Sequence, residues 1–184
     1  MKNGSMVMVA LFSVIISGCI TVAADRPYFS SIENTIQLQH KLSDKEVRVK
    51  LGTFTEANKI GDIRCRSDVN IDVAQGQTNS SYIESAMKTE LFNAGIFSVD
   101  ADIEITGELL SLAVSSFSPA FWEIEIFISS NKSKGYPIKT RLEFQTSWTA
   151  GLACKNLANA YGPAVQQLIS DIIDDPRFVD LMGP

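Results

Sequence analysis

Few residues of this chain could carry out chemistry: the three cysteines, Cys19, Cys65 and Cys154, and the single histidine, His40. A thiol can act as a nucleophile, ligate a metal, join a disulfide or accept a lipid, and a catalytic thiol usually needs a histidine as its base. No G-x-S-x-G motif occurs and no cysteine adjoins His40, so a core or sheet-face histidine is the simpler interpretation. One histidine and two cysteines also fall short of a zinc site, and we expect no metal and no cofactor.

Cys19 follows an apolar segment near the amino terminus. Residues 6–16 have the length and position of the hydrophobic part of a signal peptide, and they are fewer than the roughly 20 apolar residues that span a bilayer. The motif ISGC, residues 16–19, resembles the lipobox of bacterial lipoproteins. That resemblance implies cleavage before Cys19, a diacylglyceryl group on its sulfur and a third acyl chain on the new amino terminus. An uncleaved anchor helix and an ordinary signal peptide are the alternatives.

The lipid would be a firm anchor, because each buried methylene group contributes roughly 0.8 kcal/mol and three chains are implied. In lipoproteins of this kind an Asp directly after the cysteine retains the protein at the inner membrane. Ile20 stands there in this chain, which implies the periplasmic face of the outer membrane. Residues 1–18 are then the signal peptide, residues 19–30 a lipidated tether and residues 31–184 a single periplasmic domain.

Lipidation of Cys19 leaves Cys65 and Cys154 as an even pair in an oxidising compartment, where a disulfide is expected. Closing a loop of about 90 residues would stabilise the fold by roughly 4 kcal/mol. Two buried free thiols are the alternative. No C-x-x-C motif indicates a redox-active pair.

The charge balance restricts the possible partners. The chain carries 16 basic and 21 acidic side chains, and removing residues 1–18 takes away Lys2 alone, which lowers the net charge from −5 to −6. Nucleic acid is excluded as a partner because no cluster of Lys and Arg could follow its phosphates. The same balance disfavours an extended electrostatic contact with anionic lipid.

The amino-terminal half of the domain predicts short strands and one helix. Residues 35–42 and 47–54 alternate apolar and polar side chains, which favours two strands, although Ser30 and Glu33 could instead begin a helix in the first segment. Residues 69–73 predict a short strand. A capping box of Ser81 and Glu84 and a stop at Gly95 predict a helix over residues 82–94.

The carboxyl-terminal half predicts a meander and a long helix. Residues 101–117 form one strand with a bulge at Gly107, and residues 122–128 and 136–148 form two more, paired with Glu125 opposite Arg141 and Trp122 opposite Phe144. Trp148 is expected on the inner face. A helix over residues 154–172 is kinked or restarted at Gly162-Pro163, and Asp175 caps a short last helix that begins with Pro176.

The expected fold class is α+β, with a curved, largely antiparallel sheet of about four to five strands packed against two main helices. This order of elements, over residues 47–182, resembles the periplasmic domains of the lipopolysaccharide-translocon lipoprotein, of the peptidoglycan-synthase activators and of the amino-terminal part of the Tol-system propeller protein. The segments GELLSLAVSSFSPAFWEI and ACKNLANAYGPAVQQLI resemble an uncharacterised proteobacterial family of outer-membrane lipoproteins. These resemblances imply a binding or assembly role in the cell envelope.

Two surfaces are candidate sites. Phe117, Phe121 and Trp122 surround a proline between two strands and predict an aromatic loop that contacts a partner, unless they close the end of the core. Glu123, Glu125 and Glu143 could act as paired carboxylates of a glycosidase, or they could form a solvated face.

We therefore expect a non-enzymatic outer-membrane lipoprotein whose domain recognises an envelope protein or glycan. The alternatives are a binder of small ligands, with a pocket between the last long helix and the sheet, and a carboxylate-dependent hydrolase.

Overall fold

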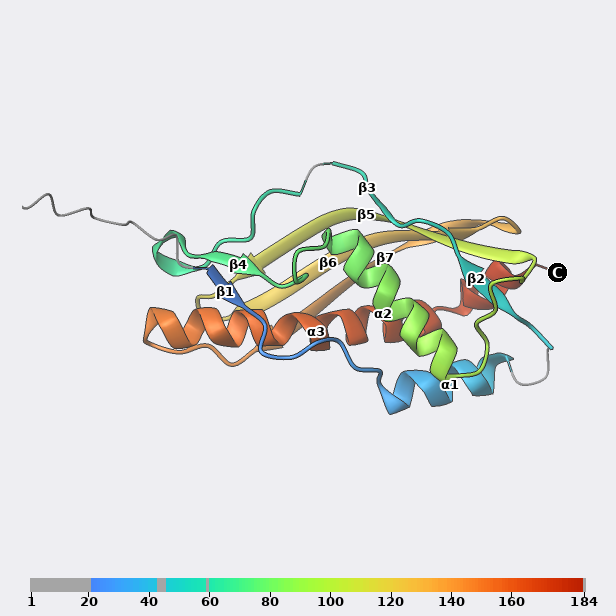
Figure 1. The fold of residues 1–184 in the computed structure, drawn as a ribbon, viewed down its shortest axis with the longest axis horizontal. Helices are drawn as coiled ribbons and strands as arrows, with labels where there is room; N and C mark the ends of the chain where they lie inside the picture. Colours follow the sequence, from blue (N-terminus) through green and yellow to red (C-terminus); the bar gives the residue numbers. More distant parts are fainter. Residues whose placement is uncertain (1–20, 43–45, 59, 184) are drawn as a thin grey trace, which may run out of the picture.

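Three long antiparallel strands form the centre of the computed structural model, which describes residues 21–42, 46–58 and 60–183 (Figure 1). They are β5 (Ile103–Ser115), β6 (Ala120–Ser130) and β7 (Ser133–Phe144). Alternate residues of β6 carry large apolar side chains that are completely buried: Trp122, Ile124, Ile126 and Ile128. The period-2 pattern of this strand therefore predicted its buried face correctly.

The register between β6 and β7 differs from the prediction by two residues. Glu125 lies opposite Lys139 and Trp122 opposite Leu142. The turn is tighter than expected, because Ser130 already pairs with Ser133 and the ladder shifts next to it. A shift by two residues keeps every side chain on its predicted face, so the error leaves the core unchanged.

Two short strands complete the sheet along β5. β2 (Val49–Leu51) and β3 (Thr55–Glu56) both run parallel to β5, in a five-stranded mixed sheet. The predicted bulge at Gly107 is wrong, since the register shift lies between Leu109 and Ser111. Gly107 has a different role: a Cβ atom there would lie 2.6 Å from the ring of Phe54, so the glycine makes room for that ring. The α+β fold class is confirmed.

Residues 35–42 do not form a strand, and that prediction is wrong. They belong to the helix α1 (Ile32–Leu42), whose first turn is capped by Ser31, with Ser31 Oγ accepting from the Asn34 amide at 3.3 Å. Leu38 and Leu42 are buried. Their spacing of four residues fits a helix as well as a strand, and packing against other helices decides the outcome.

The helix α2 (Asn79–Asn93) begins three residues earlier than predicted. Thr78, and not Ser81, is its cap, and the Thr78 hydroxyl accepts from the Ser81 amide at 3.1 Å. The end is as predicted, because Gly95 has φ +74°, a conformation that favours glycine.

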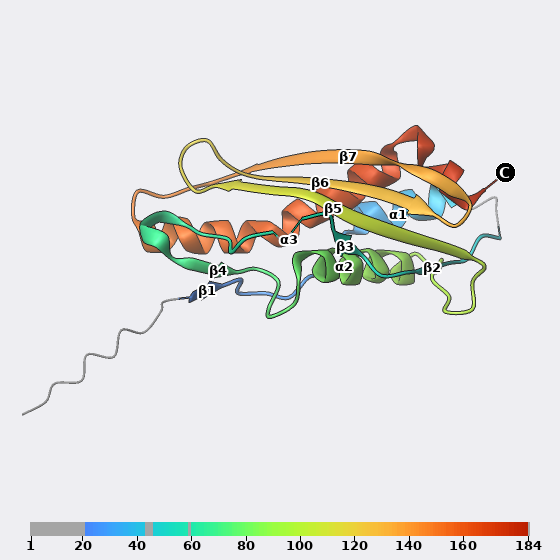
Figure 2. The ribbon, with the colours of Figure 1, turned by 90° about the horizontal axis from the view of Figure 1, so that it is seen from above.

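The helix α3 (Ala150–Asp174) is continuous through Pro163, and the predicted restart is absent from it. It packs against β6 and β7, where Trp122 Nε1 donates to the Leu157 carbonyl at 3.0 Å and the Tyr136 hydroxyl donates to the Ile172 carbonyl at 2.9 Å. The three helices lie on one face of the sheet (Figure 2). The short helix η2 (Pro176–Met182) follows, with Asp175 as its cap.

The amino-terminal segment is part of the folded domain. β1 (Thr21–Ala23) pairs in parallel with β4 (Asn70–Asp72). The Asp25 amide donates a hydrogen bond to Asn159 Oδ1 at 2.9 Å. The tether was predicted over residues 19–30. For the described residues 21–30 this is wrong, because Thr21–Ala23 pair with β4 and Asp25 bonds to Asn159 of α3.

Candidate functional site

Cys19, the predicted lipidation site, lies outside the described residues. Among residues 21–42, 46–58 and 60–183, no helix combines the length and the hydropathy that a crossing of the bilayer requires.

Cys65 and Cys154 form the expected disulfide, with their Cα atoms 5.6 Å apart. Cys65 precedes the short helix η1 (Arg66–Asp68), and Cys154 lies in the second turn of α3. The bond therefore fixes η1 beside the amino-terminal end of α3.

Arg66 joins three segments at this end of the molecule. Its guanidinium donates to the Ser147 carbonyl at 2.7 Å, to the Ser116 carbonyl at 2.6 Å and to the Thr146 hydroxyl at 3.0 Å. The same group lies 4.6 Å from the centre of the Phe117 ring. Arg66 thus holds the β5–β6 loop beside the segment that leads into α3.

A hollow of about 450 Å³ opens between these segments, lined by Arg66, Phe117, Ser118, Thr146, Ser147 and Trp148. Two of the lining side chains are apolar and open to solvent, since Phe117 is 64% exposed and Trp148 is completely exposed. Leu152, in the first turn of α3 that follows Trp148, is 51% exposed. We call Phe117, Trp148 and Leu152 the terminal apolar surface. Trp148 was predicted on the inner face of the sheet, which is wrong because β7 ends at Phe144, before the alternation reaches it.

The predicted contact loop is only partly exposed. Trp122 is completely buried and packs on Tyr161 at 4.9 Å between ring centres, so its side chain closes the core and is removed from the candidate surface. Phe121 lies on the outer face of the sheet, where the Arg141 guanidinium covers it at 3.6 Å. Of the three predicted residues, Phe117 alone presents a largely open side chain.

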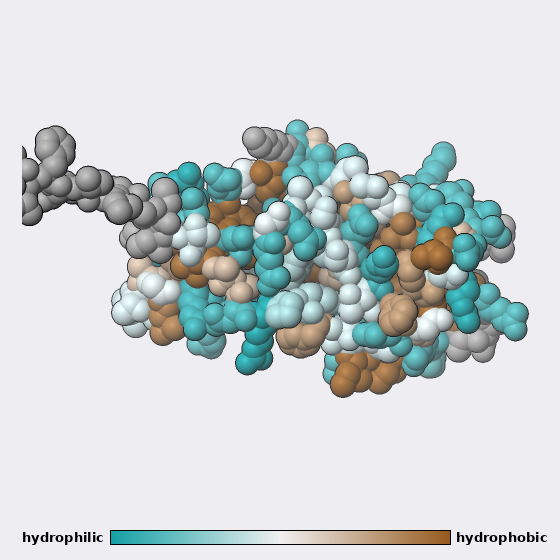
Figure 3. All heavy atoms as spheres, viewed as in Figure 1, coloured by the Kyte–Doolittle hydropathy of each residue, from teal (hydrophilic) through white to brown (hydrophobic). Residues whose placement is uncertain are grey.

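A second set of exposed apolar side chains includes two residues of α1, one of the segment before it and one of α2. Four large apolar side chains are exposed there by more than half: Phe29 by 58%, Ile32 by 73%, Ile36 by 57% and Phe92 by 68%. We call these four residues the α1 patch. Figure 3 shows hydrophobic side chains gathered at the lower edge of the molecule, over the start of α1. The spacing of Ile32 and Ile36 would have indicated this patch if the helical alternative had been chosen.

Glu90 fixes the elements under the α1 patch. It is a completely buried carboxylate on α2, and Oε1 accepts from the Tyr28 hydroxyl at 2.5 Å and from the Ser31 amide at 2.8 Å. Burial, followed by the hydrogen bond to Glu90, raises the pKa of the Tyr28 phenol, which therefore stays a donor. Asn93 adds a bond from Nδ2 to Ser30 Oγ at 2.7 Å. Sequence reasoning missed Glu90, since nothing in its local pattern marks a buried acid.

Two of the three carboxylates on the outer face of the sheet, Glu123 and Glu143, are paired with cations. Lys139 Nζ lies 2.9 Å from Glu123, and Arg141 lies 3.8 Å from Glu123 and 3.6 Å from Glu143. The hydrogen bond from Lys139 lowers the pKa of Glu123. A general acid for glycoside hydrolysis needs a raised pKa, so this arrangement favours the solvated-face interpretation. Glu125 accepts from the Ser111 hydroxyl at 3.2 Å.

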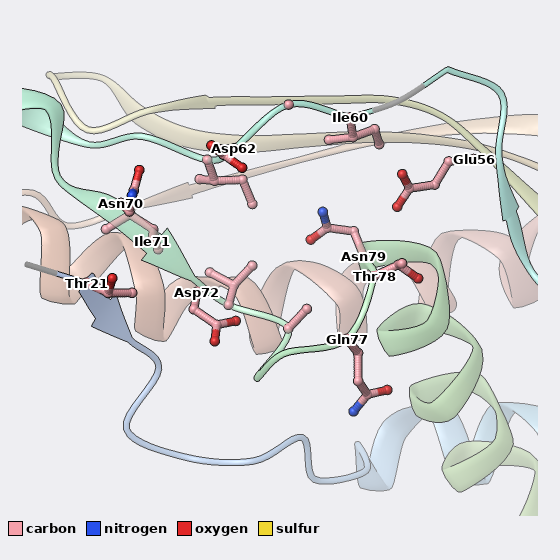
Figure 4. Close-up of a pocket in the computed structure, with 14 residues that line it drawn as sticks. Thr21, Glu56, Ile60, Asp62, Asn70, Ile71, Asp72, Gln77, Thr78 and Asn79 are labelled. Atoms are coloured by element: carbon pink, nitrogen blue, oxygen red, sulfur yellow. The ribbon is translucent and has the colours of Figure 1, made fainter. Parts of the chain in front are cut away.

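A polar cleft of about 520 Å³ lies between β4, β1 and the start of α2 (Figure 4). Carboxylates and amides, among them Glu56, Asp62, Asn70, Asp72 and Asn79, share its lining with apolar side chains. In the part of the chain that the structure describes, no three His, Cys, Asp or Glu side chains are placed to hold a metal together. The expected ligand pocket between α3 and the sheet is filled by core side chains such as Trp122 and Tyr161.

No protein-family model and no curated protein matches this sequence. The chain is similar to solved structures of low identity. A Xanthomonas campestris protein of family DUF330 superposes with a TM-score of 0.46 and 8% identity, over 84% of this chain and 90% of that one. The hypothetical protein CT253 of Chlamydia trachomatis gives 0.45 and 6%, over 69% and 93%. A PelC dodecamer from Paraburkholderia phytofirmans gives 0.35 and 10%, over 74% and 86%. At these scores the likeness carries no conclusion about function.

Proposed function

We propose that this protein is an outer-membrane lipoprotein, anchored through Cys19, whose periplasmic domain recognises another protein of the envelope and catalyses no reaction. The observation that carries the recognition role is the α1 patch. Single exposed apolar side chains are common on soluble domains, whereas several large ones on adjacent elements are typical of contact surfaces.

The α1 patch has the features of a preformed binding surface. Ile32 and Ile36 are one turn apart on the same helix, and the buried Glu90 carboxylate joins the start of this helix to α2 through Ser31. Because these elements are already fixed, binding a partner would cost little conformational entropy on this side of the interface. A helix face of this kind fits an apolar groove or a second helix.

The anchor is supported by the lipobox-like motif at residues 16–19. Intact-mass measurement on protein extracted from membranes should show loss of residues 1–18 and the added mass of lipid. Cys19→Ser removes the thiol that would carry the lipid. This variant should therefore be absent from the membrane fraction. An unprocessed chain that begins at Met1 would contradict the anchor.

Partner recognition can be tested in cells with a photo-crosslinking residue at position 32. We expect a discrete protein adduct at Ile32 and none at Lys132, an exposed turn residue outside both apolar surfaces. Adducts of equal intensity at both positions would refute a specific site.

The polar cleft supports a second candidate function, the binding of a small polar ligand. Its volume lies within the range of about 300–1,000 Å³ that is usual for ligand sites, and polar groups stand beside apolar side chains in its lining. If the cleft and not the α1 patch is the site, the Asp72→Asn variant should fail to complement a deletion of the gene. The Ile32→Arg variant should then still complement it.

A further inference from the structure

We propose that the terminal apolar surface lies in the lipid interface of the leaflet that holds the acyl chains of Cys19. This inference rests on the proposed anchor and adds an orientation to it: Phe117, Trp148 and Leu152 contact phospholipid, and the domain sits directly on the bilayer.

The first argument is the distance along the chain between the anchor and the fold. Cys19 precedes Thr21 by two residues, and Thr21 is already paired with Asn70 in the β1–β4 ladder. Two residues of extended chain span at most about 7 Å. An acylated Cys19 would therefore hold the β1 end of the domain within a few ångströms of the lipid head groups.

The second argument is that the terminal apolar surface lies at this same end. Val69 closes the turn that contains η1, since the Cys65 amide donates to the Val69 carbonyl at 2.9 Å, and the next residue, Asn70, forms an antiparallel bridge with Arg64. Arg66 of that turn holds both the Phe117 loop and the segment of Trp148. Figures 1 and 2 both show β1, β4, the β5–β6 loop and the start of α3 gathered at one end of the long axis. The anchor and the exposed aromatic side chains thus share one pole of the molecule.

The third argument is the chemistry of the two segments that carry these side chains. Residues 109–122 and 144–154 contain no Asp, Glu, Lys or Arg, although charged residues make up 20% of the chain. Trp favours the boundary between head groups and acyl chains, where its ring is buried and its polar N–H stays hydrated, and Phe and Leu insert apolar side chains at the same depth. A charge-free surface of this composition suits lipid and avoids repulsion from anionic head groups.

The charged side chains near this surface form ion pairs. The net negative charge of the whole chain therefore does not oppose contact with anionic lipid at this place. Arg64 pairs with Asp68 at 2.6 Å, and Lys155 pairs with Asp25 at 3.1 Å. Arg66 then adds one cation beside the hollow, where lipid phosphates would lie. Asp62 also lies near Arg64, at 3.9 Å, so three acidic side chains face three basic ones in this group.

The two tryptophans make the inference directly testable, because Trp122 is completely buried and Trp148 is completely exposed. Lipidated full-length protein is reconstituted into vesicles of phosphatidylethanolamine and phosphatidylglycerol, with and without bromine on the acyl chains. We expect brominated lipid to quench part of the tryptophan emission, and we expect the Trp148→Phe variant to lose all of that quenching. Val99→Ser, which changes an exposed apolar residue outside both apolar surfaces, should leave the quenching unchanged.

The possible failures are distinguishable. If the protein carries lipid and floats with the vesicles but Trp148 is not quenched, the orientation is wrong and the anchor stands. If Trp148 instead forms crosslinks to a protein in intact envelopes, the surface is a protein interface and the inference is overturned. If the protein carries no lipid and does not float, the proposed anchor itself fails.

Discussion

The terminal apolar surface and the α1 patch are both exposed and apolar, yet they are built in different ways. The first is formed by loops that Arg66 and the Cys65–Cys154 disulfide hold together, and its charge-free segments lie at the end where the anchor is proposed. The second is a helix face on a buried carboxylate. The difference is consistent with the two neighbours proposed above: lipid places few demands on the shape of a charge-free surface, while a specific protein partner requires side chains held in a fixed arrangement.

The largest expected effect comes from removing the disulfide. Replacing Cys65 and Cys154 by serine should lower the free energy of unfolding by about 4 kcal/mol, because the loop of 89 residues is released in the unfolded chain. Urea denaturation measures this loss. The local effect should appear at the terminal apolar surface, as faster amide hydrogen exchange near Arg66. The amide exchange rates in α1 should stay unchanged. Equal loosening of both regions would contradict the separate construction of the two surfaces.

Removing the Glu90 carboxylate should have a comparable but smaller effect at the other surface. Glu90→Ala leaves the Tyr28 hydroxyl and the Ser31 amide without their acceptor, which should cost about 3 kcal/mol. Denaturant unfolding gives the magnitude, and crosslinking at position 32 should weaken. Glu108→Ala, at an exposed position of β5, is the matched control and should change neither result.

A charge introduced into the α1 patch should separate binding from stability. Ile32→Arg should weaken partner binding by about 2 kcal/mol, as expected for a central contact residue, and change unfolding by less than about 0.5 kcal/mol. Val99→Arg, at another exposed apolar position, should leave binding intact. Titration with the purified partner, once crosslinking has identified it, measures binding. A similar loss of binding in both variants would argue against the patch.

Asp175 provides a reference outside both surfaces. Hydrogen bonds from Arg177 lower the pKa of its carboxyl below the ordinary value of 3.8, and the Arg177 amide donates to it at 2.8 Å. A lowered pKa stabilises the fold above the unfolded value, and the stabilisation is lost as the pH falls through the folded value. Asp175→Asn should therefore cost roughly 0.5–1 kcal/mol at neutral pH, because the ion pair with Arg177 is lost while the amide oxygen can still cap the helix. In thermal melts, the gap between variant and wild type should close in strong acid; a gap independent of pH would contradict this role.

The smallest effect on stability is expected at Trp148. Its side chain is completely exposed, so Trp148→Ala should change the free energy of unfolding by less than about 0.5 kcal/mol. A larger loss in chemical denaturation would mean that the ring supports the fold and is not free for lipid.

The central strands and the long helix could be predicted because the spacing of their apolar residues directly indicates which side chains are buried. In β6 every second residue from Trp122 to Ile128 is apolar and buried, and Asp175-Pro176 marks the start of η2 without ambiguity. The register between β6 and β7 could not be fixed in the same way, since partners two residues apart satisfy the same faces.

The surfaces were harder to predict than the core. Segment 35–42 fits both periods, and only its packing in three dimensions makes it a helix with Ile36 outside. Trp148 was placed inside by extending an alternation past the end of its strand. Glu90 lies under the α1 patch because α2 and residues 28–31 meet there, which is a contact between segments about 60 residues apart in the sequence.

The pairing of β1 with β4 also limits how far the domain can reach. A flexible linker of n residues extends over about 5–6 Å multiplied by the square root of n, and this chain keeps one residue, Ile20, between Cys19 and the first paired strand. With the proposed lipid in place, the domain has almost no freedom to search the periplasm. Its partner must then come to the inner surface of the outer membrane, within one molecular length of the bilayer.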